Sequence, residues 1–247
     1  MSKIYITGIK GFIGSNLKLK LKKRKIKVKE FNKEIIKKNI NFSKEILIHL
    51  GQSSVVKNKF NKMEVDFIKE LNKLNFMHYI YISSTKIYDD INHKNYVKLK
   101  LKSEENFIKK KSTIFRCSNI YGPKQRKPNL LNIIINQLEK GNLIILDNLS
   151  NKIDYLWIED LTDLIYKAIK FKIPGTFNVV SSEKYSVKQI CLKLKKLKNL
   201  KKINIIEKKI NIIKSKKIYY KKTENTFKWK PKINLDRGLK ILLNENK

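Results

Sequence analysis

The stretch Thr7-Gly8-Ile9-Lys10-Gly11-Phe12-Ile13-Gly14 joins a short apolar run to an amphipathic pattern that predicts a helix. Gly8 permits a tight turn off a strand, Gly11 lets the backbone approach a pyrophosphate, and Gly14 lets the helix pack closely on the strand. The N-terminus of that helix offers N–H groups and the positive end of its dipole to phosphates. The stretch therefore predicts a strand–turn–helix unit that binds the diphosphate of a dinucleotide.

Downstream of this unit, apolar runs of strand length alternate with helical patterns, which indicates βαβ units and a parallel sheet. We therefore predict the α/β class, with a Rossmann-like doubly wound parallel sheet and a small C-terminal substrate-binding lobe. The expected strands are Lys3–Ile6, Lys25–Phe31, Ile46–Leu50, Tyr79–Ser83, Ser112–Arg116 and Leu143–Leu146, and the expected helices are Phe12–Lys23, Asn58–Leu74, Tyr96–Lys109, Leu130–Leu138 and Ile158–Ile169. The last stretch, Ser186–Lys247, reads as a helix, a strand and a closing helix after Pro231.

The domain organisation follows from the same pattern, because no linker or repeat cuts the chain into independent modules. We expect a dinucleotide-binding domain over residues 1–122, to which 150–180 return. Residues 123–149 and 181–247 are expected to form the smaller substrate-binding lobe.

Composition narrows the class of protein. The chain has 247 residues, 41% of them hydrophobic and 10% aromatic, which excludes a disordered or collagen-like protein. No apolar run approaches the roughly 20 residues that cross a bilayer. The two cysteines, Cys117 and Cys191, are too few for a disulfide framework or a metal site. We expect a soluble cytoplasmic protein without a metal centre.

The formal net charge is +36, which ordinarily suggests a nucleic-acid partner. Only four of the 57 basic residues are arginine, however, whereas phosphate recognition favours arginine forks. Lysine, asparagine and isoleucine are abundant together, as AT-rich codons would make them, and the lysines are spread along the chain. Compositional drift therefore explains the charge better, and a nucleic-acid partner is not expected.

The end of the second expected strand decides between NAD and NADP. A carboxylate there usually binds the adenosine ribose, and Asn32 takes that place. Asparagine can hydrogen-bond a hydroxyl and does not repel a 2′-phosphate, so both cofactors stay open. Asn32 is equally well read as a turn residue.

A second group of polar residues fits the same site. The run Tyr79–Ser84 predicts a buried strand that ends in hydroxyls, where open α/β sheets bind ligands. Tyr96, Lys100 and Glu104 are spaced to share one face of a helix. An ammonium beside a phenol favours the phenolate, so we expect Lys100 to lower the pKa of Tyr96 toward working pH.

At this point the chain resembles the extended short-chain dehydrogenases/reductases, in particular the NAD-dependent epimerase/dehydratase family that acts on nucleotide sugars. Thr7–Gly14 matches TGxxGFIG, and Tyr96–Glu104 fits YxxxKxxxE. Further segments resemble family motifs in order: His49–Gln52 (HLAAQ), Ser83–Tyr88 (SSxxVY), Arg116–Pro123 (RxxNxYGP), Asp154–Asp160 (DYxxVxD), Pro174–Val179 (GxYNV) and Trp229–Pro231 (WxP).

The resemblance implies roles for particular residues. Tyr96 would be the acid/base, Lys100 would support it and hold the nicotinamide ribose, and Ser84 would hydrogen-bond the reacting oxygen. The implied cofactor-binding residues are Thr7, Gly8, Gly11, Phe12, Ile13, Gly14, Asn32, His49, Leu50, Gly51, Lys100 and Cys117. The expected substrate-binding residues are Ser84, Thr85 and Asn119, with a turn role as the alternative for Asn119, and Lys152 or Lys217 in place of the family's diphosphate-binding arginine, unless that grip is partly lost.

The chain also departs from the family pattern. Between Phe31 and Ile46 there is room for one short helix, so the sheet is expected to lack a strand. The arginine that grips the diphosphate is replaced by Ile153. Dehydratases of the family carry Asp-Glu after the active-site hydroxyl, whereas this chain has Thr85 and Lys86.

Two functions therefore remain. The first is an NAD(P)-dependent epimerase or keto-reductase of a nucleoside-diphosphate sugar. The alternative is a catalytically reduced member of the fold that binds RNA or a protein through its basic surface. A homodimer through the Tyr96 helix, with Phe107 and Ile108, is implied by resemblance, and His78 and His93 are expected at the surface.

Overall fold

The computed structural model describes residues 2–36, 40–51, 62–88, 94–125, 129–210 and 218–245. Contacts divide the chain into two compact units. The first contains residues 1–118, 158–179 and 218–230, and the second contains residues 119–157, 180–217 and 231–247. The chain thus passes between the units several times, and each unit is assembled from segments far apart in the sequence.

The first unit is built on a six-stranded sheet in which every neighbouring pair of strands is parallel. Its order is β2 (Val28–Glu30), β1 (Ile4–Thr7), β3 (Ile46–His49), β4 (His78–Ser84), β5 (Ser112–Cys117) and β9 (Gly175–Val179). All seven residues of β4 are buried, because a central parallel strand is covered on both faces. The α/β class and the doubly wound parallel sheet are confirmed.

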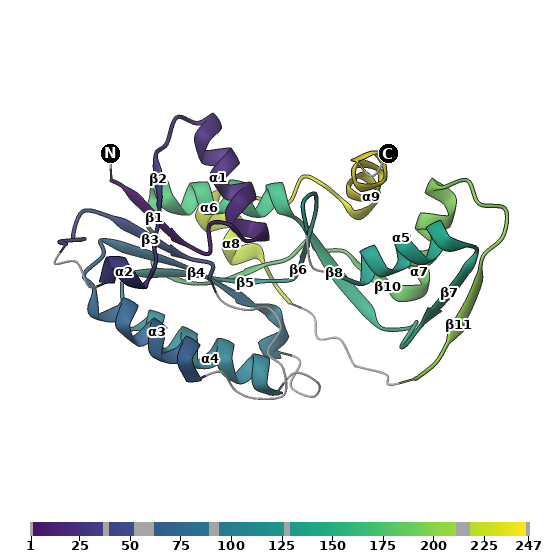
Figure 1. The fold of residues 1–247 in the computed structure, drawn as a ribbon, viewed down its shortest axis with the longest axis horizontal. Coiled ribbons are helices and arrows are strands. Elements are labelled where there is room, and N and C mark those ends of the chain that lie inside the picture. The colour runs from purple at the N-terminus through teal and green to yellow at the C-terminus, as the bar shows by residue number, and fades with distance from the viewer. Residues whose placement is uncertain are drawn as a thin grey trace. The chain divides into compact units, whose positions relative to one another are not determined.

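Helices cover both faces of this sheet (Figure 1). On one face lie α1 (Phe12–Lys23), α6 (Ile158–Phe171) and α8 (Lys221–Phe227), and on the other lie α3 (Lys62–Lys73) and α4 (Lys94–Ile108). The core on the α3 and α4 side is rich in aromatic rings, with Tyr5 in edge contact with Phe31, Phe42 and Phe76.

The second unit has two small sheets. One has the order β10 (Lys184–Ser186), β8 (Lys152–Trp157) and β6 (Asn119–Tyr121), and the other pairs β7 (Leu143–Leu146) with β11 (Asn204–Glu207). Its helices are α5 (Leu130–Lys140), α7 (Val187–Leu197) and α9 (Leu235–Glu245). Ser186 and Gln189 form a capping box that starts α7 where β10 ends.

Several sequence predictions for the elements are confirmed and others are wrong. Among the described residues between Phe31 and Ile46, the four-residue helix α2 (Lys33–Ile36) is the one element. This agrees with the prediction that the sheet lacks a strand there. The strands β6, β8, β9 and β10 and helix α8 were not predicted. None of the helices described is long and apolar enough to cross a membrane.

Two buried side chains overturn surface predictions. His78 is 1% exposed, and its Nε2 lies 2.7 Å from the hydroxyl of Thr113, whose proton is donated to the carbonyl of Ile173. Phe107 is fully buried and stacks on Tyr81, so it cannot form part of a dimer surface on α4. Ile108 is 60% exposed, whereas His93 lies outside the described residues.

Candidate active site

The turn after β1 places three glycines where side chains do not fit. Gly8 has a φ of 67°, and a Cβ there would lie 2.6 Å from the Cα of Gly51. A Cβ on Gly14 would lie 2.3 Å from the oxygen of Gly8. A Cβ on Gly11 would meet only that same oxygen, at 3.2 Å. Gly8 and Gly14 are therefore required by backbone packing, whereas the space beside Gly11 is open to a ligand.

Thr7 ties the end of β1 to the end of β3. Its hydroxyl oxygen accepts hydrogen bonds from the backbone N–H groups of Leu50 and Gly51, each at 3.0 Å. With both lone pairs used, the hydroxyl donates its proton to Nδ1 of His49 at 2.8 Å. Burial, with the charge of Lys100, lowers the pKa of His49 to about 3. The imidazole is thus neutral and holds the two strand ends together.

The N-terminus of α1 fits the diphosphate of a dinucleotide. Phe12 and Ile13 open the helix after Gly11, which makes no side-chain capping bond, and the first turn has no acidic residue. The backbone N–H groups of a first helical turn have no partner within the helix and attract an anion. Together with the open space at Gly11, these N–H groups form a site for a phosphate, and a Cβ on Gly11 would occupy part of that space.

Asn32 lies directly after Phe31 beyond β2, and its side chain is used locally. Its Oδ1 accepts from the N–H of Ile35 at 3.2 Å, and its Nδ2 lies 3.5 Å from a carboxylate oxygen of Glu34. The alternative interpretation as a turn residue is thus supported, and the exposed amide stays accessible to a ribose.

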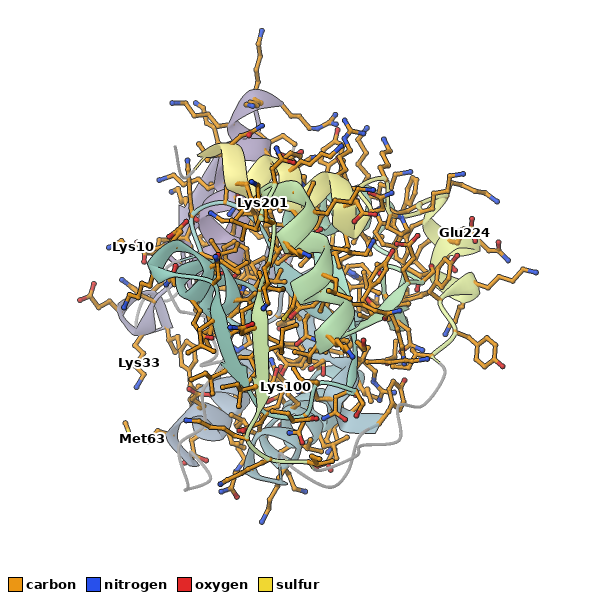
Figure 2. All side chains as sticks on the ribbon, turned by 90° about the vertical axis from the view of Figure 1, so that its right-hand side faces the viewer. Lys10, Lys33, Met63, Lys100, Lys201 and Glu224 are labelled. Atoms are coloured by element: carbon orange, nitrogen blue, oxygen red, sulfur yellow. The ribbon has the colours of Figure 1, made fainter. Side chains whose placement is uncertain are left out.

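Ser84, Tyr96 and Lys100 come together at the carboxyl end of β4. The side chains of Tyr96 and Ser84 share a hydrogen bond. The Nζ of Lys100 lies 5.7 Å from the centre of the Tyr96 ring and donates to the backbone oxygen of Ile82 at 2.9 Å. Figure 2 shows Lys10 and Lys33 extending away from the ribbon, whereas Lys100 lies within it and is only 6% exposed.

Burial dominates the electrostatics of this group. It lowers the pKa of Lys100 to about 8, although Cys117, Glu64 and Glu104 each favour the charged form. It raises the pKa of Tyr96 above its ordinary value, and the hydrogen bond from Ser84 opposes that change only in part. The expectation that the pKa of Tyr96 is lowered toward working pH is therefore wrong for the protein without ligands, because burial raises it.

Thr85 and Cys117 flank the group. The Thr85 hydroxyl, at the start of the short helix η1 (Thr85–Tyr88), donates to the backbone oxygen of Cys117 at 3.4 Å. Cys117 pairs with Ser84 in the sheet, and burial raises the pKa of its thiol to about 12. The thiol is therefore protonated at neutral pH and does not serve as a nucleophile.

The expected substrate-binding residues beyond this edge belong to the second unit. Asn119 in β6 donates from its amide to the backbone oxygen of Asp154 at 3.3 Å, which joins β6 to β8. Lys152 is exposed at the start of β8. Lys217 lies outside the described residues.

The sequence did not reveal a polar network beside Ser84, Tyr96 and Lys100. Glu104 accepts from Ser83 and from Arg116, Arg116 also donates to the hydroxyl of Tyr88, and that hydroxyl donates to Asn178. The motif resemblances include all five of these residues, but spacing along the chain does not reveal that they meet.

The sheet order and the glycine turn after β1 define an α/β protein of Rossmann type. Residues 61–179 match the model of the NAD dependent epimerase/dehydratase family, which confirms the resemblance to that family over this part of the chain.

Solved structures share the fold over nearly the whole chain. One is RMD from Pseudomonas aeruginosa complexed with NADPH, with a TM-score of 0.80, 16% identity and coverage of 99% of this chain and 98% of that one. Another is UDP-glucose 4-epimerase from Thermotoga maritima with UDP-glucose, with a TM-score of 0.81, 18% identity and coverage of 98% and 97%. A third is dTDP-glucose 4,6-dehydratase from Bacillus anthracis with NAD, with a TM-score of 0.78, 16% identity and coverage of 99% and 96%. The search of curated proteins found no match.

Proposed function

We propose that the protein is an NAD(P)-dependent epimerase or keto-reductase that acts on a nucleoside-diphosphate sugar. The observation that carries this proposal is the meeting of Ser84, Tyr96 and Lys100 at the carboxyl end of β4. The family match and the nicotinamide cofactors and nucleotide sugars in the compared structures support it. The cytoplasm is the proposed location.

The first unit supplies the cofactor site. The N–H groups at the start of α1 and the open space beside Gly11 suit the diphosphate, and Asn32 suits the adenosine ribose. Lys100 suits the nicotinamide ribose, because its ammonium group is fixed at Ile82 and needs no rearrangement to donate. Once bound, a nicotinamide ring supplies the hydride acceptor or donor.

The side chains of the site would handle the proton. As the phenolate, Tyr96 takes a proton from a hydroxyl of the sugar, and as the phenol it gives one to a carbonyl oxygen. On substrate binding, the single proton of the Ser84 hydroxyl, which faces Tyr96 in the protein without ligands, would turn to that oxygen and stabilise the charge that develops there. Lys100 is charged below about pH 8 and stabilises the phenolate when it forms.

The residues after Ser84 favour epimerisation or reduction over loss of water. Elimination of water needs an additional acid and base at the sugar, and Thr85 and Lys86 stand where the dehydratases carry a carboxylate pair. The Thr85 hydroxyl is also occupied by the backbone of Cys117. Neither side chain provides a carboxylate for that step.

The test is conversion of a panel of nucleoside-diphosphate sugars in the presence of NAD⁺ or NADPH, followed by chromatography of the products. Tyr96→Phe should lower the rate of conversion by at least about a hundredfold while cofactor binding persists. Tyr166→Phe is the matched control. It also removes the hydroxyl of a tyrosine that lies beside cations, here Arg24 and Lys170, but this tyrosine is on α6. Conversion by the Tyr96→Phe variant at the parent rate would refute the proposal.

A further inference from the structure

We propose that Glu104 is a positioning residue that fixes the contact between Tyr96 and Ser84, by locking α4 against β4 and by holding η1 through Arg116 and Tyr88. This inference rests on the proposed function, since it assigns to the network the placement of that acid/base pair.

The lock between α4 and β4 has three points. Lys100 donates to the backbone oxygen of Ile82, Glu104 accepts from the hydroxyl of Ser83, and Tyr96 bonds to Ser84. Three consecutive residues of β4 are thus bonded to three residues of α4 that are spaced one turn apart. Rotation or sliding of the helix would break all three bonds together, so loss of the Glu104 contact leaves the other two less constrained.

Arg116 makes the position of the Glu104 carboxylate specific. Its Nε lies 3.1 and 3.2 Å from the two carboxylate oxygens, and its Nη2 lies 2.6 Å from Oε2. Glu104 is only 2% exposed, so its charge is stabilised by this forked contact rather than by water. Because Arg116 lies on β5 and Glu104 on α4, the pair attaches the helix to a second strand.

Tyr88 extends the network to the turn that follows Ser84. Its hydroxyl accepts from Nη1 of Arg116 at 2.7 Å and donates to Oδ1 of Asn178 on β9 at 2.9 Å. At the other end of the same turn, the N–H of Lys86 donates to the hydroxyl of Ser84 at 3.2 Å. The turn is therefore held at both ends, and the orientation of the Ser84 hydroxyl depends on where Tyr88 is anchored.

The first test is Glu104→Gln, with Glu105→Gln as the matched control on the same helix. Glu105 is exposed and pairs only with Lys102 among the contacts described for it, at 2.8 Å. Glu104→Gln should lower kcat about tenfold, as loss of near-attack geometry does, with KM and cofactor affinity within about twofold of the parent. Glu105→Gln should leave all three unchanged.

A double-mutant cycle separates positioning from general loss of structure. In a Tyr96→Phe background, Glu104→Gln should cause no further loss of the residual rate, because its effect acts through the tyrosine. If the two losses multiply instead, or if Glu104→Gln leaves kcat unchanged in an enzyme that Tyr96→Phe inactivates, the positioning role is wrong while the proposed function stands.

A second measurement does not depend on catalysis. In the protein without cofactor, Glu104→Gln and Tyr88→Phe should both accelerate amide hydrogen exchange in residues 84–88, and Glu105→Gln should not. Tyr88→Phe removes only the hydroxyl and keeps the ring in place. If exchange is unchanged in both variants, the inference is wrong even if the wild type converts sugars. If exchange is faster in both variants but the wild type converts no sugar, only the proposed function is refuted.

Discussion

The Nζ of Lys100 donates to the backbone oxygen of Ile82 at 2.9 Å, in a place that is only 6% exposed. A lysine so placed is held close to the edge of the sheet where the ligand is expected. Its ammonium group is also partly deprived of water, and burial lowers its pKa to about 8. The charge of Lys100 therefore changes close to physiological pH.

This placement predicts an alkaline limit to activity. A lysine with a pKa of about 8 is charged below that pH and neutral above it, so kcat/KM should fall as the pH rises through about 8. Glu64, Glu104, Cys117 and Tyr96 are among the groups near Lys100, together with Tyr81 and His49, and the carboxylates oppose the effect of burial. The measurement is the pH profile of kcat/KM.

Two lysine variants of the same helix check the assignment. Lys100→Gln should lower the rate and remove the alkaline limit near pH 8. Lys98→Gln, at an exposed position, should keep both the rate and the limit. A limit that survives Lys100→Gln would assign it to another group.

The glycine turn predicts a separation between folding and binding. In Gly14→Ala, a Cβ would lie 2.3 Å from the oxygen of Gly8, which should cost about 3 kcal/mol of stability as overpacking does. In Gly11→Ala, the added Cβ lies 3.2 Å from that oxygen, a tight contact but a longer one than at Gly14, so the loss of stability should be smaller. Its dissociation constant for NAD(P) should rise about tenfold, which corresponds to about 1.4 kcal/mol.

Thermal unfolding and fluorescence titration with NADH or NADPH measure the two effects. Equal losses of stability in Gly11→Ala and Gly14→Ala would mean that both glycines serve packing alone.

Asn32 predicts a change in cofactor preference. Asn32→Asp keeps the oxygen that accepts from the N–H of Ile35, and it adds a negative charge beside the expected adenosine ribose. The carboxylate should bind a ribose hydroxyl and repel a 2′-phosphate, which should shift the affinity ratio about tenfold toward NAD. Asn41→Asp is the matched control, because Asn41 makes the same kind of local bond to Ser43. An unchanged ratio of the two dissociation constants would place the ribose elsewhere.

Two buried histidines predict acid sensitivity. The pKa of His49 is lowered to about 3 and that of His78 to about 4, against about 6.5 in an unfolded chain. Between these values the unfolded chain binds more protons, so stability rises with pH up to about 6.5 and is lost on acidification. For fully buried His49, the free energy of unfolding should change by about 1.4 kcal/mol per pH unit where the unfolded chain is protonated and the folded protein is not.

Urea unfolding at several pH values between 5 and 6.5 measures this slope. His78→Gln should reduce the slope of the unfolding free energy against pH by the contribution of one histidine. An identical slope in that variant would show that His78 is protonated in the folded protein.

The parts of the fold that the sequence could predict are those with continuous burial or special backbone requirements. β4 is buried along its whole length, and the three glycines of the first turn stand at positions that packing dictates. In contrast, β10 has three half-buried residues and β6 only one buried residue, so neither produces an apolar run. In α8 only Thr223 and Phe227 are buried, which is too few to reveal a helical period.

The candidate site was predictable as a set of residue types but not as a set of contacts. Local spacing placed Tyr96, Lys100 and Glu104 on one face of a helix, whereas the partner of Glu104 on β5 depends on tertiary packing. The pKa of Tyr96 was mispredicted because the sequence shows a neighbouring charge but does not show how deeply the phenol is buried.

The contact between Gly8 and Gly51 has a consequence for how the gene can vary. Glycine codons are rich in G and C, so a drift toward A and T tends to remove them, and the chain retains only eight glycines beside its many lysines. Where two backbones touch, every amino-acid replacement adds at least a methyl group in occupied space, as at Gly8 and Gly14. Such a drift would thus be opposed at this corner by steric exclusion, because a side chain on Gly8 or Gly14 would occupy space that backbone atoms already fill.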